Sequence, residues 1–377
     1  MPVHVLIAPD KFTGSLTGAQ VAAAVDAGLR DVLPDVRTTR LPVADGGDGT
    51  VDAFVAAGWR RVALTASGPT GSPVETSYAR RGDTAVVELA NACGRLLLPG
   101  GLPDPLGAST YGLGEVVAAA LDAGATRIVL GLGGSASTDG GAGFLQALGA
   151  SVRDEGGADV RRGGAALADV ASVDLAGLHP ALAAATVVVA GDVDNPLCGP
   201  HGAAAVYGLQ KGATAQDVAV LDAALAHFAA IVAGATGRDL AGEPGAGAAG
   251  GTGFGALVLG AQIRSGIELV LELIGFPAAL ADADLVITGE GSLDRQTLAG
   301  KAPVGVAVAA RRQGVPVVAL AGRCLLDSDE IARAGFASVR PLSAVEPDPA
   351  RSIANAAVLV RRVAADLATE LAAGRFG

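Results

Sequence analysis

The sequence predicts an α/β protein in which helices pack against a largely parallel β-sheet. Half of the 377 residues are hydrophobic but only 3% are aromatic, so small aliphatic side chains must form the core. Short apolar runs alternate with amphipathic stretches of helical spacing, which is the pattern of strand–helix units. The 55 glycines follow no repeat and cluster where the expected strands end. At about 100–200 residues per domain, the length is sufficient for two domains.

Short apolar runs predict the strands of this fold. They cover residues 3–8, 36–42, 74–78, 84–88, 128–132, 186–190, 285–288 and 315–321. The runs 74–78 and 84–88 flank a turn at Arg81-Gly82-Asp83 and predict a hairpin. Apolar residues at helical spacing follow most of the runs, and residues 353–371 predict one long C-terminal helix. The glycine-alanine tract 243–255 fits either a flexible linker or a tightly packed turn.

Charge and composition exclude several classes of protein. The net charge of −11 argues against nucleic acid or an anionic membrane as a general partner. Apolar stretches are interrupted well before about 18 residues, so we expect no membrane span. The three cysteines and four histidines are scattered, and predict neither a disulfide framework nor a zinc site. The N-terminus shows no basic region followed by an apolar segment, so we expect a cytoplasmic protein.

The stretch 128–143 is the strongest candidate for a binding site. A buried strand opens through small residues into a helix, so backbone N–H groups there can face an anion. The residues that could contact such an anion are Gly133, Gly134, Ser135, Ser137, Thr138, Asp139 and Gly140. A tight strand-to-helix turn without a ligand is the alternative.

Acidic and basic side chains follow several other predicted strands. Ligands of open parallel sheets bind beyond the carboxyl ends of the strands, where these loops are expected to lie. Carboxylates in such loops can hold Mg²⁺ or a substrate hydroxyl. The residues concerned are Asp10, Lys11 and Ser15; Asp45, Gly46, Gly47 and Asp48; Asp192, Asp194 and Asn195; and Glu290, Asp294 and Lys301. For each loop the alternative is a helix cap or a surface turn, with Ser15 or Thr17 as one such cap.

Two common phosphate-binding motifs are missing. The sequence holds no G-x-x-x-x-G-K-[ST] loop and no G-x-G-x-x-G fingerprint in the right place. If the chain binds phosphates, it uses loops of its own.

Taken together, these motifs resemble the type I glycerate kinase family. The matching stretches are APDKFTGSL (8–16), ADGGDGT (44–50), ASTYGLGE (108–115), LGGSASTDGGAG (132–143), GDVDNPLCGPHGAA (191–204), QKGA (210–213), GAGAAGG (245–251) and ITGEGSLDRQTLAGK (287–301). They span nearly the whole chain in the family's order. One position departs from the family, because Thr13 stands where a lysine is usual. Lys11 is the candidate to supply that charge.

The resemblance implies an ATP-dependent kinase that phosphorylates D-glycerate, typically at the 2-hydroxyl. It implies ATP and Mg²⁺ as cofactors, Glu290 and Asp294 near the metal, and a small-molecule substrate rather than a nucleic acid or membrane partner. It also implies that the residues of the stretch 128–143 that could contact an anion bind the nucleotide. Among the catalytic candidates, Asp192 is the base, Asp45 its substitute, and Lys211 a phosphate or carboxylate contact. The candidate substrate or phosphate contacts are Asp10, Lys11, Ser15, Gly46, Gly47, Asp194, Asn195 and Lys301. A 3-phosphoglycerate product, a nicotinamide-dependent dehydrogenase and a non-catalytic anion-binding protein are the alternatives, and the chain is expected to be a monomer or homodimer.

The family's fold is a discontinuous Rossmann-like parallel-sheet domain with a second α/β domain inserted, and the resemblance implies an active-site cleft between the two. Pro69, Gly71 and Pro73 break the pattern and indicate that the insertion begins near residue 67. We expect residues 1–66, 107–148 and 280–377 to form the Rossmann-like domain. Residues 67–106 and 149–279 would then form the inserted domain.

Overall fold

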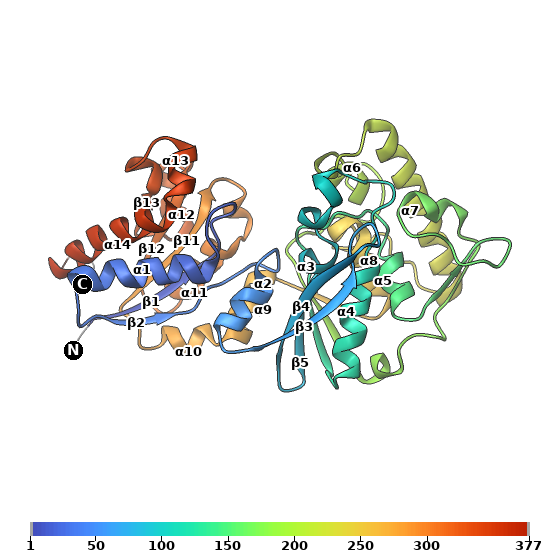
Figure 1. Cartoon of the computed structure of the whole chain (residues 1–377), viewed down its shortest axis with the longest axis horizontal. Coiled ribbons are helices and arrows are strands. Elements are labelled where there is room, and N and C mark those ends of the chain that lie inside the picture. The colour runs from blue at the N-terminus through green and yellow to red at the C-terminus, as the bar shows by residue number, and fades with distance from the viewer. Residues whose placement is uncertain (1–2, 375–377) are drawn as a thin grey trace. The chain divides into compact units, whose positions relative to one another are not determined.

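The computed structural model describes residues 3–374 and separates into two compact units (Figure 1). Unit 1 comprises Met1–Asp45, Asp52–Gly58 and Ile267–Gly377, and unit 2 comprises Gly46–Val51 and Trp59–Gly266. The chain is therefore α/β with a discontinuous first unit, as the sequence predicts. The predicted boundaries differ in four places: residues 46–51, 59–66 and 107–148 belong to unit 2, and residues 267–279 belong to unit 1.

Unit 1 contains a five-stranded, wholly parallel sheet in the order β13-β12-β11-β1-β2. The strands are β1 His4–Pro9, β2 Arg37–Arg40, β11 Leu285–Leu293, β12 Val317–Cys324 and β13 Ser338–Pro341. From β1 the chain moves to β2 on one side, whereas β11 on the other side leads outward to β12 and β13. The order therefore reverses between β1 and β11, which is where open α/β sheets bind their ligands.

Helices cover the sheet of unit 1. Helix α1 (Gly18–Val32) begins with a capping box in which Thr17 and Gln20 exchange side-chain-to-backbone hydrogen bonds, so Thr17 is the cap. Val21, Val25 and Leu29 of α1 are buried with the apolar face of α14 (Ala356–Ala372), and the two helices lie side by side in Figure 1. The other helices are α2 Thr50–Ala56, α9 Gly266–Ile274, α10 Phe276–Leu280, α11 Ala302–Arg311, α12 Ser328–Ala334 and α13 Pro349–Ala354; α2 and α9 start in segments assigned to unit 2.

Unit 2 contains a six-stranded mixed sheet in the order β10-β9-β6-β5-β4-β3. The strands are β3 Arg60–Ser67, β4 Pro73–Arg81, β5 Thr84–Glu88, β6 Arg127–Gly131, β9 Thr186–Ala190 and β10 Gln262–Arg264. β3, β4 and β5 form antiparallel pairs, whereas β5, β6, β9 and β10 run parallel. Because β6 pairs with β5 on one side and β9 on the other, the segment 107–148 cannot belong to the other sheet.

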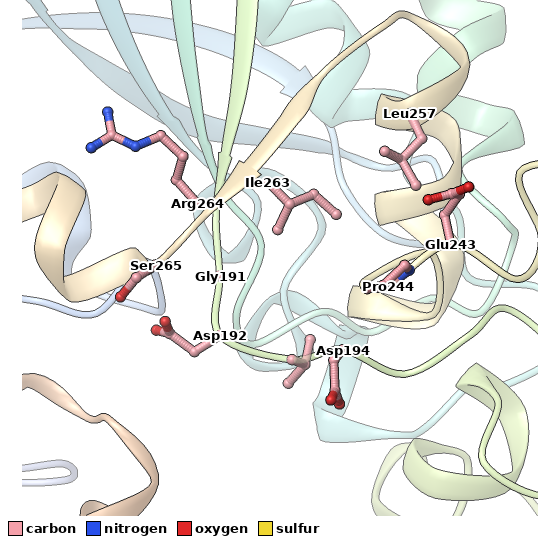
Figure 2. A pocket seen from close by; sticks show the side chains of 10 residues that line it. Gly191, Asp192, Asp194, Glu243, Pro244, Leu257, Ile263, Arg264 and Ser265 are labelled. Carbon is pink, nitrogen blue, oxygen red and sulfur yellow. The ribbon is translucent and has the colours of Figure 1, made fainter.

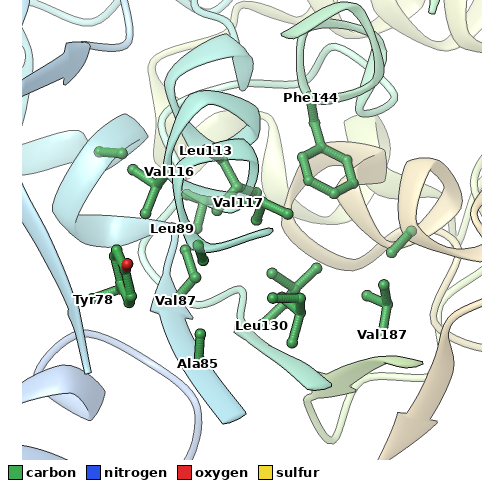
Figure 3. Close-up of a cluster of buried hydrophobic side chains, with 14 of the residues drawn as sticks. Tyr78, Ala85, Val87, Leu89, Leu113, Val116, Val117, Leu130, Phe144 and Val187 are labelled. Atoms are coloured by element: carbon green, nitrogen blue, oxygen red, sulfur yellow. The ribbon is translucent and has the colours of Figure 1, made fainter. Parts of the chain in front are cut away.

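Two apolar clusters form the core of unit 2. In the first, Leu113, Val116 and Val117 of α4 (Tyr111–Asp122) pack against Val87 of β5 and Leu130 of β6 (Figure 3). The second surrounds Phe228 of α7. The remaining elements are α3 Ala90–Cys93, α5 Ala142–Ala147, α6 Ala203–Tyr207, α7 Ala215–Thr236, α8 Ala248–Val258 and the hairpin of β7 Ser151–Arg153 with β8 Ser172–Asp174.

Helix α7 is the one helix of the described residues that is long and apolar enough to cross a membrane, judged by length and composition alone. Leu221, Phe228 and Val232 of this helix are buried in the second core of unit 2. A single helix of this kind is weak evidence for a membrane span, and 33% of its apolar window is buried.

Several elements differ from the sequence prediction, and the strands β3, β7, β8, β10 and β13 had no predicted counterpart. β3 was not expected, because its residues are mostly exposed or half-buried and carry no continuous apolar run. β11 continues to Leu293, beyond the four apolar residues that predicted it. The predicted C-terminal helix is two helices, because Asn355 leaves helical geometry between α13 and α14. The tract 243–255 is a packed turn rather than a linker, since most of its residues are buried and α8 begins within it.

Candidate functional site

Three carboxylates gather at the carboxyl edge of the unit 1 sheet. Asp10 directly follows β1, and Glu290 lies in β11, one position beyond the pair Pro9–Gly289. Asp45 ends the loop that follows β2 and interacts electrostatically with both. Asp10, Asp45 and Glu290, here called the acid cluster, thus lie where the strand order reverses.

Burial and the repulsion of neighbouring carboxylates keep Asp10 and Glu290 from ionising easily. Burial, and then the charges of Asp45 and Glu290, raise the pKa of Asp10 to about 8, although the backbone N–H of Lys11 donates to its Oδ1 at 2.6 Å. Burial also raises the pKa of Glu290. The Thr297 hydroxyl donates to Glu290 Oε1 at 2.5 Å and opposes that shift, as does the charge of Lys301. Carboxyl groups whose pKa is raised in this way are suited to hold a proton or to bind a cation.

The loops beside the acid cluster carry the other predicted residues of unit 1. Asp294 Oδ1 accepts from the backbone N–H of Gln296, while its own N–H donates to the Thr297 hydroxyl. The half-buried Lys301 precedes α11. In the first loop the Ser15 hydroxyl donates to the carbonyl of Phe12, so Ser15 closes the turn rather than capping α1.

The described residues include no group of three or more His, Cys, Asp or Glu side chains arranged to hold a metal ion by themselves. Mg²⁺ commonly binds one or two carboxylates together with substrate phosphates and water. The hard oxygen donors of the acid cluster and Asp294 fit that requirement.

In unit 2 the structure brings together two glycine motifs that lie far apart in the sequence. Gly47 packs against Gly133 so closely that a Cβ on Gly133 would come within 2.5 Å of the Gly47 Cα. The N–H of Gly133 donates to the Gly46 carbonyl at 3.3 Å, and Gly46 itself adopts φ +91° against the Ala190 carbonyl. Gly46, Gly47, Gly133 and Gly134, here called the glycine face, lie at the carboxyl ends of β6 and β9.

Beyond the glycine face, the loop turns into the protein. Ser135, Ser137, Thr138, Asp139 and Gly140 are buried. The Asp139 carboxylate accepts hydrogen bonds from Ser109 and Thr110 and from the backbone N–H groups of Gly141 and Gly143. Burial raises the pKa of Asp139, while these donors lower it. Its contacts are therefore those of a residue that orders the loop; nucleotide contact stays a prediction.

Lys211 lies beneath the same loop. Its side chain is 4% exposed, and Nζ donates to the Ser137 carbonyl. Burial lowers the pKa of Lys211 to about 7, which the charge of Asp139 partly opposes. The hydroxyl oxygens of Ser137 and Thr138 are buried and have no hydrogen-bond partner among the described residues. This region thus holds more polar groups than its protein contacts satisfy.

Asp192 and Asp194 line a pocket of about 430 Å³ beyond β9 and β10 (Figure 2). Both carboxylate oxygens of Asp192 accept from the backbone N–H of Gly266, at 3.2 and 3.1 Å, so the side chain is tethered to the start of α9. Figure 2 shows that the two carboxylates point in different directions. Residues two apart share a direction within a strand, but β9 ends at Ala190, before both of them.

Asn195 closes the loop that follows this pocket. Its Nδ2 donates to the His201 carbonyl at 2.9 Å, and Tyr207 donates to its Oδ1 at 2.8 Å. These bonds use both ends of the amide. They hold residues 195–207 in place.

The comparisons with known proteins agree with this geometry. The family model described as the glycerate kinase family matches residues 5–372. The chain belongs to the glycerate kinase family. Its fold is that of a solved structure from Salmonella typhimurium LT2, described as a candidate glycerate kinase 2, with a TM-score of 0.86, 42% identity and full coverage of both chains.

Two curated relatives of the glycerate kinase family extend over most of the chain. "Glycerate kinase" of Bacillus subtilis strain 168 is 44% identical over 373 residues, which cover 98% of both chains. "Glycerate 2-kinase" of Escherichia coli K12 is 40% identical over 344 residues, 89% of this chain and 90% of that protein. The chain is therefore an enzyme of the glycerate kinase family with a small-molecule substrate.

Sequence reasoning missed several residues around the predicted site of this glycerate kinase. Ser109 and Thr110 bind Asp139, and the N–H of Gly140 donates to the Gly250 carbonyl. Glu88 is 1% exposed and binds the ADGGDGT loop. Ser109 and Thr110 lie in the family motif ASTYGLGE, so the sequence contained a signal for them. It contained no signal for Glu88, because a single acid at the end of an apolar strand predicts no partner.

Proposed function

We propose that the chain is an ATP-dependent kinase that phosphorylates the 2-hydroxyl of D-glycerate, giving 2-phosphoglycerate and ADP. Family membership supports the reaction class, and the name of the Escherichia coli relative supports the 2-position. The observation that carries the proposal is the acid cluster at the reversal of strand order, with Lys301 beside Glu290. Phosphoryl transfer needs such oxygen donors and positive charge around a transferring phosphate.

The glycine face is the proposed phosphate cradle of unit 2. Its four residues have no side chains, so a polyanion can approach the backbone closely. Ser135 and Gly140 continue the same loop, and Ser137 and Thr138 contribute the hydroxyls that the described protein leaves unpartnered. Lys211 and Asp139 hold this loop from below.

Unit 1 is proposed to bind the metal. Glu290 and Asp294 would hold Mg²⁺, with Asp10 and Asp45 next to them. When bound, Mg²⁺ neutralises charge on the phosphates. Lys11 and Lys301 are the proposed cationic contacts to phosphate or to the substrate carboxylate.

Asp192 is the proposed acceptor of the hydroxyl proton. It is exposed to a pocket of substrate size, and its bond to Gly266 fixes the direction of the carboxylate. Asp194 and Asn195 are proposed to border the substrate. Asp45 is the alternative base.

The product distinguishes this proposal from its alternatives. Phosphorus NMR of a mixture with ATP, Mg²⁺ and D-glycerate should show 2-phosphoglycerate, whereas 3-phosphoglycerate would assign transfer to the other hydroxyl. ADP release should depend on both glycerate and Mg²⁺. It should stop with excess chelator and return with Mg²⁺, while circular dichroism stays unchanged. Full activity in metal-free buffer would contradict the metal assignment.

We also propose a cytoplasmic location and a monomeric or homodimeric state. All three cysteines are free thiols, which suits a reducing compartment. Cell fractionation and light scattering test these two points.

A further inference from the structure

The ADGGDGT loop changes unit twice within a few residues. Asp45 and Asp52 belong to unit 1, whereas Gly46–Val51 belongs to unit 2. Within the loop, the Thr50 hydroxyl donates to the Gly47 carbonyl at 2.6 Å and closes a tight turn. The turn leaves the N–H groups of Gly49 and Val51 to find acceptors outside the loop.

Glu88 provides both acceptors. It is the last residue of β5, paired in register with Gly131, and its side chain is 1% exposed. Oε1 accepts from the N–H of Gly49 at 2.9 Å, and Oε2 accepts from the N–H of Val51 at 2.8 Å. A buried carboxylate is costly unless its oxygens are hydrogen-bonded, so this pairing sets the position of the loop.

We propose that Glu88 is a positioning residue for turnover: it fixes the loop so that Gly46 and Gly47 complete the glycine face. Gly46 already fits against Ala190 with no room for a Cβ, and Gly133 has no room for a Cβ against the Gly47 Cα. A small shift of the loop would therefore open the face. The inference depends on the proposed function, in which this face holds phosphates.

Only a carboxylate can accept from the N–H groups of Gly49 and Val51 with one oxygen each. A glutamine has the same size but one acceptor oxygen, so its NH₂ group would meet one of the two backbone N–H groups. One buried donor would then lose its partner. The core packing around position 88 would remain.

The test compares Glu88→Gln with Glu115→Gln. Glu115 is a matched control, because its Oε2 accepts from the backbone N–H of Ser67 at 2.6 Å within unit 2, outside the loop. Both variants should lose some thermal stability. Well below both melting temperatures, kcat/KM should fall about tenfold or more for Glu88→Gln and by less than about twofold for Glu115→Gln.

Hydrogen exchange provides a readout that does not use activity. The amides of Gly49 and Val51 should exchange faster in Glu88→Gln than in the wild type. In Glu115→Gln their exchange rates should equal those of the wild type. If Glu88→Gln does not fold, Glu88→Asp replaces it, because its shorter side chain cannot reach both donors. Wild-type kcat/KM in a folded variant would overturn the inference. A wild type that does not phosphorylate glycerate would overturn the proposed function instead, and the exchange of these two amides would still decide whether Glu88 fixes the loop.

Discussion

The carboxylate of Asp139 accepts hydrogen bonds from both the backbone N–H and the hydroxyl of Thr110, at 2.8 and 2.9 Å for Oδ2. The Thr110 hydroxyl oxygen in turn accepts a hydrogen bond from the backbone N–H of Phe144, at 2.9 Å. The buried acid is thus joined to a residue that lies 29 positions earlier in the chain. The loop that follows β6 is held to the start of α4 in this way.

Asp139→Asn should destabilise the protein by about 2–3 kcal/mol, because an amide nitrogen would face donors that now point at a carboxylate oxygen. Ser109→Ala removes one hydroxyl donor, at 3.2 Å, and should cost less than about 1 kcal/mol. Urea unfolding of the two variants measures the difference. Equal losses of unfolding free energy would contradict the role of Asp139 as the shared acceptor of these hydrogen bonds.

Lys211→Met should stabilise the protein more at pH 6 than at pH 9.5. Burial lowers the pKa of Lys211 to about 7, so the unfolded chain binds more protons than the folded one between that value and the ordinary lysine pKa. The cost of burying the charge is complete below pH 7 and declines as the pH rises toward the ordinary pKa. The difference between wild type and variant should exceed about 1 kcal/mol.

Thermal melts at the two pH values measure this effect, and activity assays should show that the same variant is impaired. Lys211→Arg is the contrasting variant. Its guanidinium stays charged and needs more space, so it should destabilise the protein at both pH values. A stability difference that does not depend on pH in Lys211→Met would contradict the lowered pKa.

Asp10→Asn should stabilise the protein at pH 8.5 relative to pH 5. The raised pKa, about 8, means that the folded state holds a proton that the unfolded state has released. Wild-type stability therefore falls as the pH rises from the ordinary aspartate range to about 8. Asparagine cannot ionise and avoids this loss, by about 1 kcal/mol or more.

Asp35→Asn, at an exposed carboxylate, is the control for removing one acidic charge elsewhere in unit 1. Chemical denaturation at pH 5 and pH 8.5 gives both values. Activity of Asp10→Asn should fall if the acid cluster binds the metal.

Gly133→Ala should damage the glycine face. The added Cβ would lie 2.5 Å from the Gly47 Cα, and backbone cannot move aside as a flexible side chain can. We expect a loss of about 1–3 kcal/mol and a higher KM for ATP. Gly234→Ala is the control: it lies within α7, nothing is within 4 Å of its Cβ, and it should stabilise the protein by about 0.5–1 kcal/mol.

Asp192→Asn and Asp192→Ala together separate catalysis from tethering. Asparagine retains an oxygen that can accept from the N–H of Gly266, but it is not a base. If Asp192 accepts the hydroxyl proton, kcat should fall about 100-fold or more in Asp192→Asn, with the melting temperature nearly unchanged. Alanine should show the same kcat loss and a lower melting temperature. Near wild-type kcat in Asp192→Asn would transfer the role to Asp45.

The sequence predicts the fold class and the places where loops carry polar groups, because strand ends and glycines are local signals. It does not predict which strands pair. β6 was assigned to the wrong unit for that reason, since its apolar run fits either sheet and only its partners β5 and β9 decide. Strand β3 was not predicted because its residues are mostly exposed or half-buried at the edge of the sheet.

The candidate site shows the same limit. Asp10 and Glu290 both follow predicted strands, so each could be named, but their proximity follows from the pairing of β1 with β11. The packing of Gly47 on Gly133 likewise depends on tertiary structure. Asp139 and Glu88 are identical in residue type to surface acids, and only their burial shows that each orders a loop.

The pairing of β1 with β11 has a consequence for synthesis of the chain. β1 pairs with β11 at Val5–Leu285 and Ile7–Ile287, so the N-terminal strand leaves the ribosome long before its partner exists. Unit 2 is almost continuous from Trp59 to Gly266 and can bury its core while the rest is still being translated. Until then Leu6 and Ile7, both fully buried in the finished protein, remain exposed. β1 can pair with β2 early but with β11 only late, and during that interval its other edge is open to aggregation or to chaperone binding.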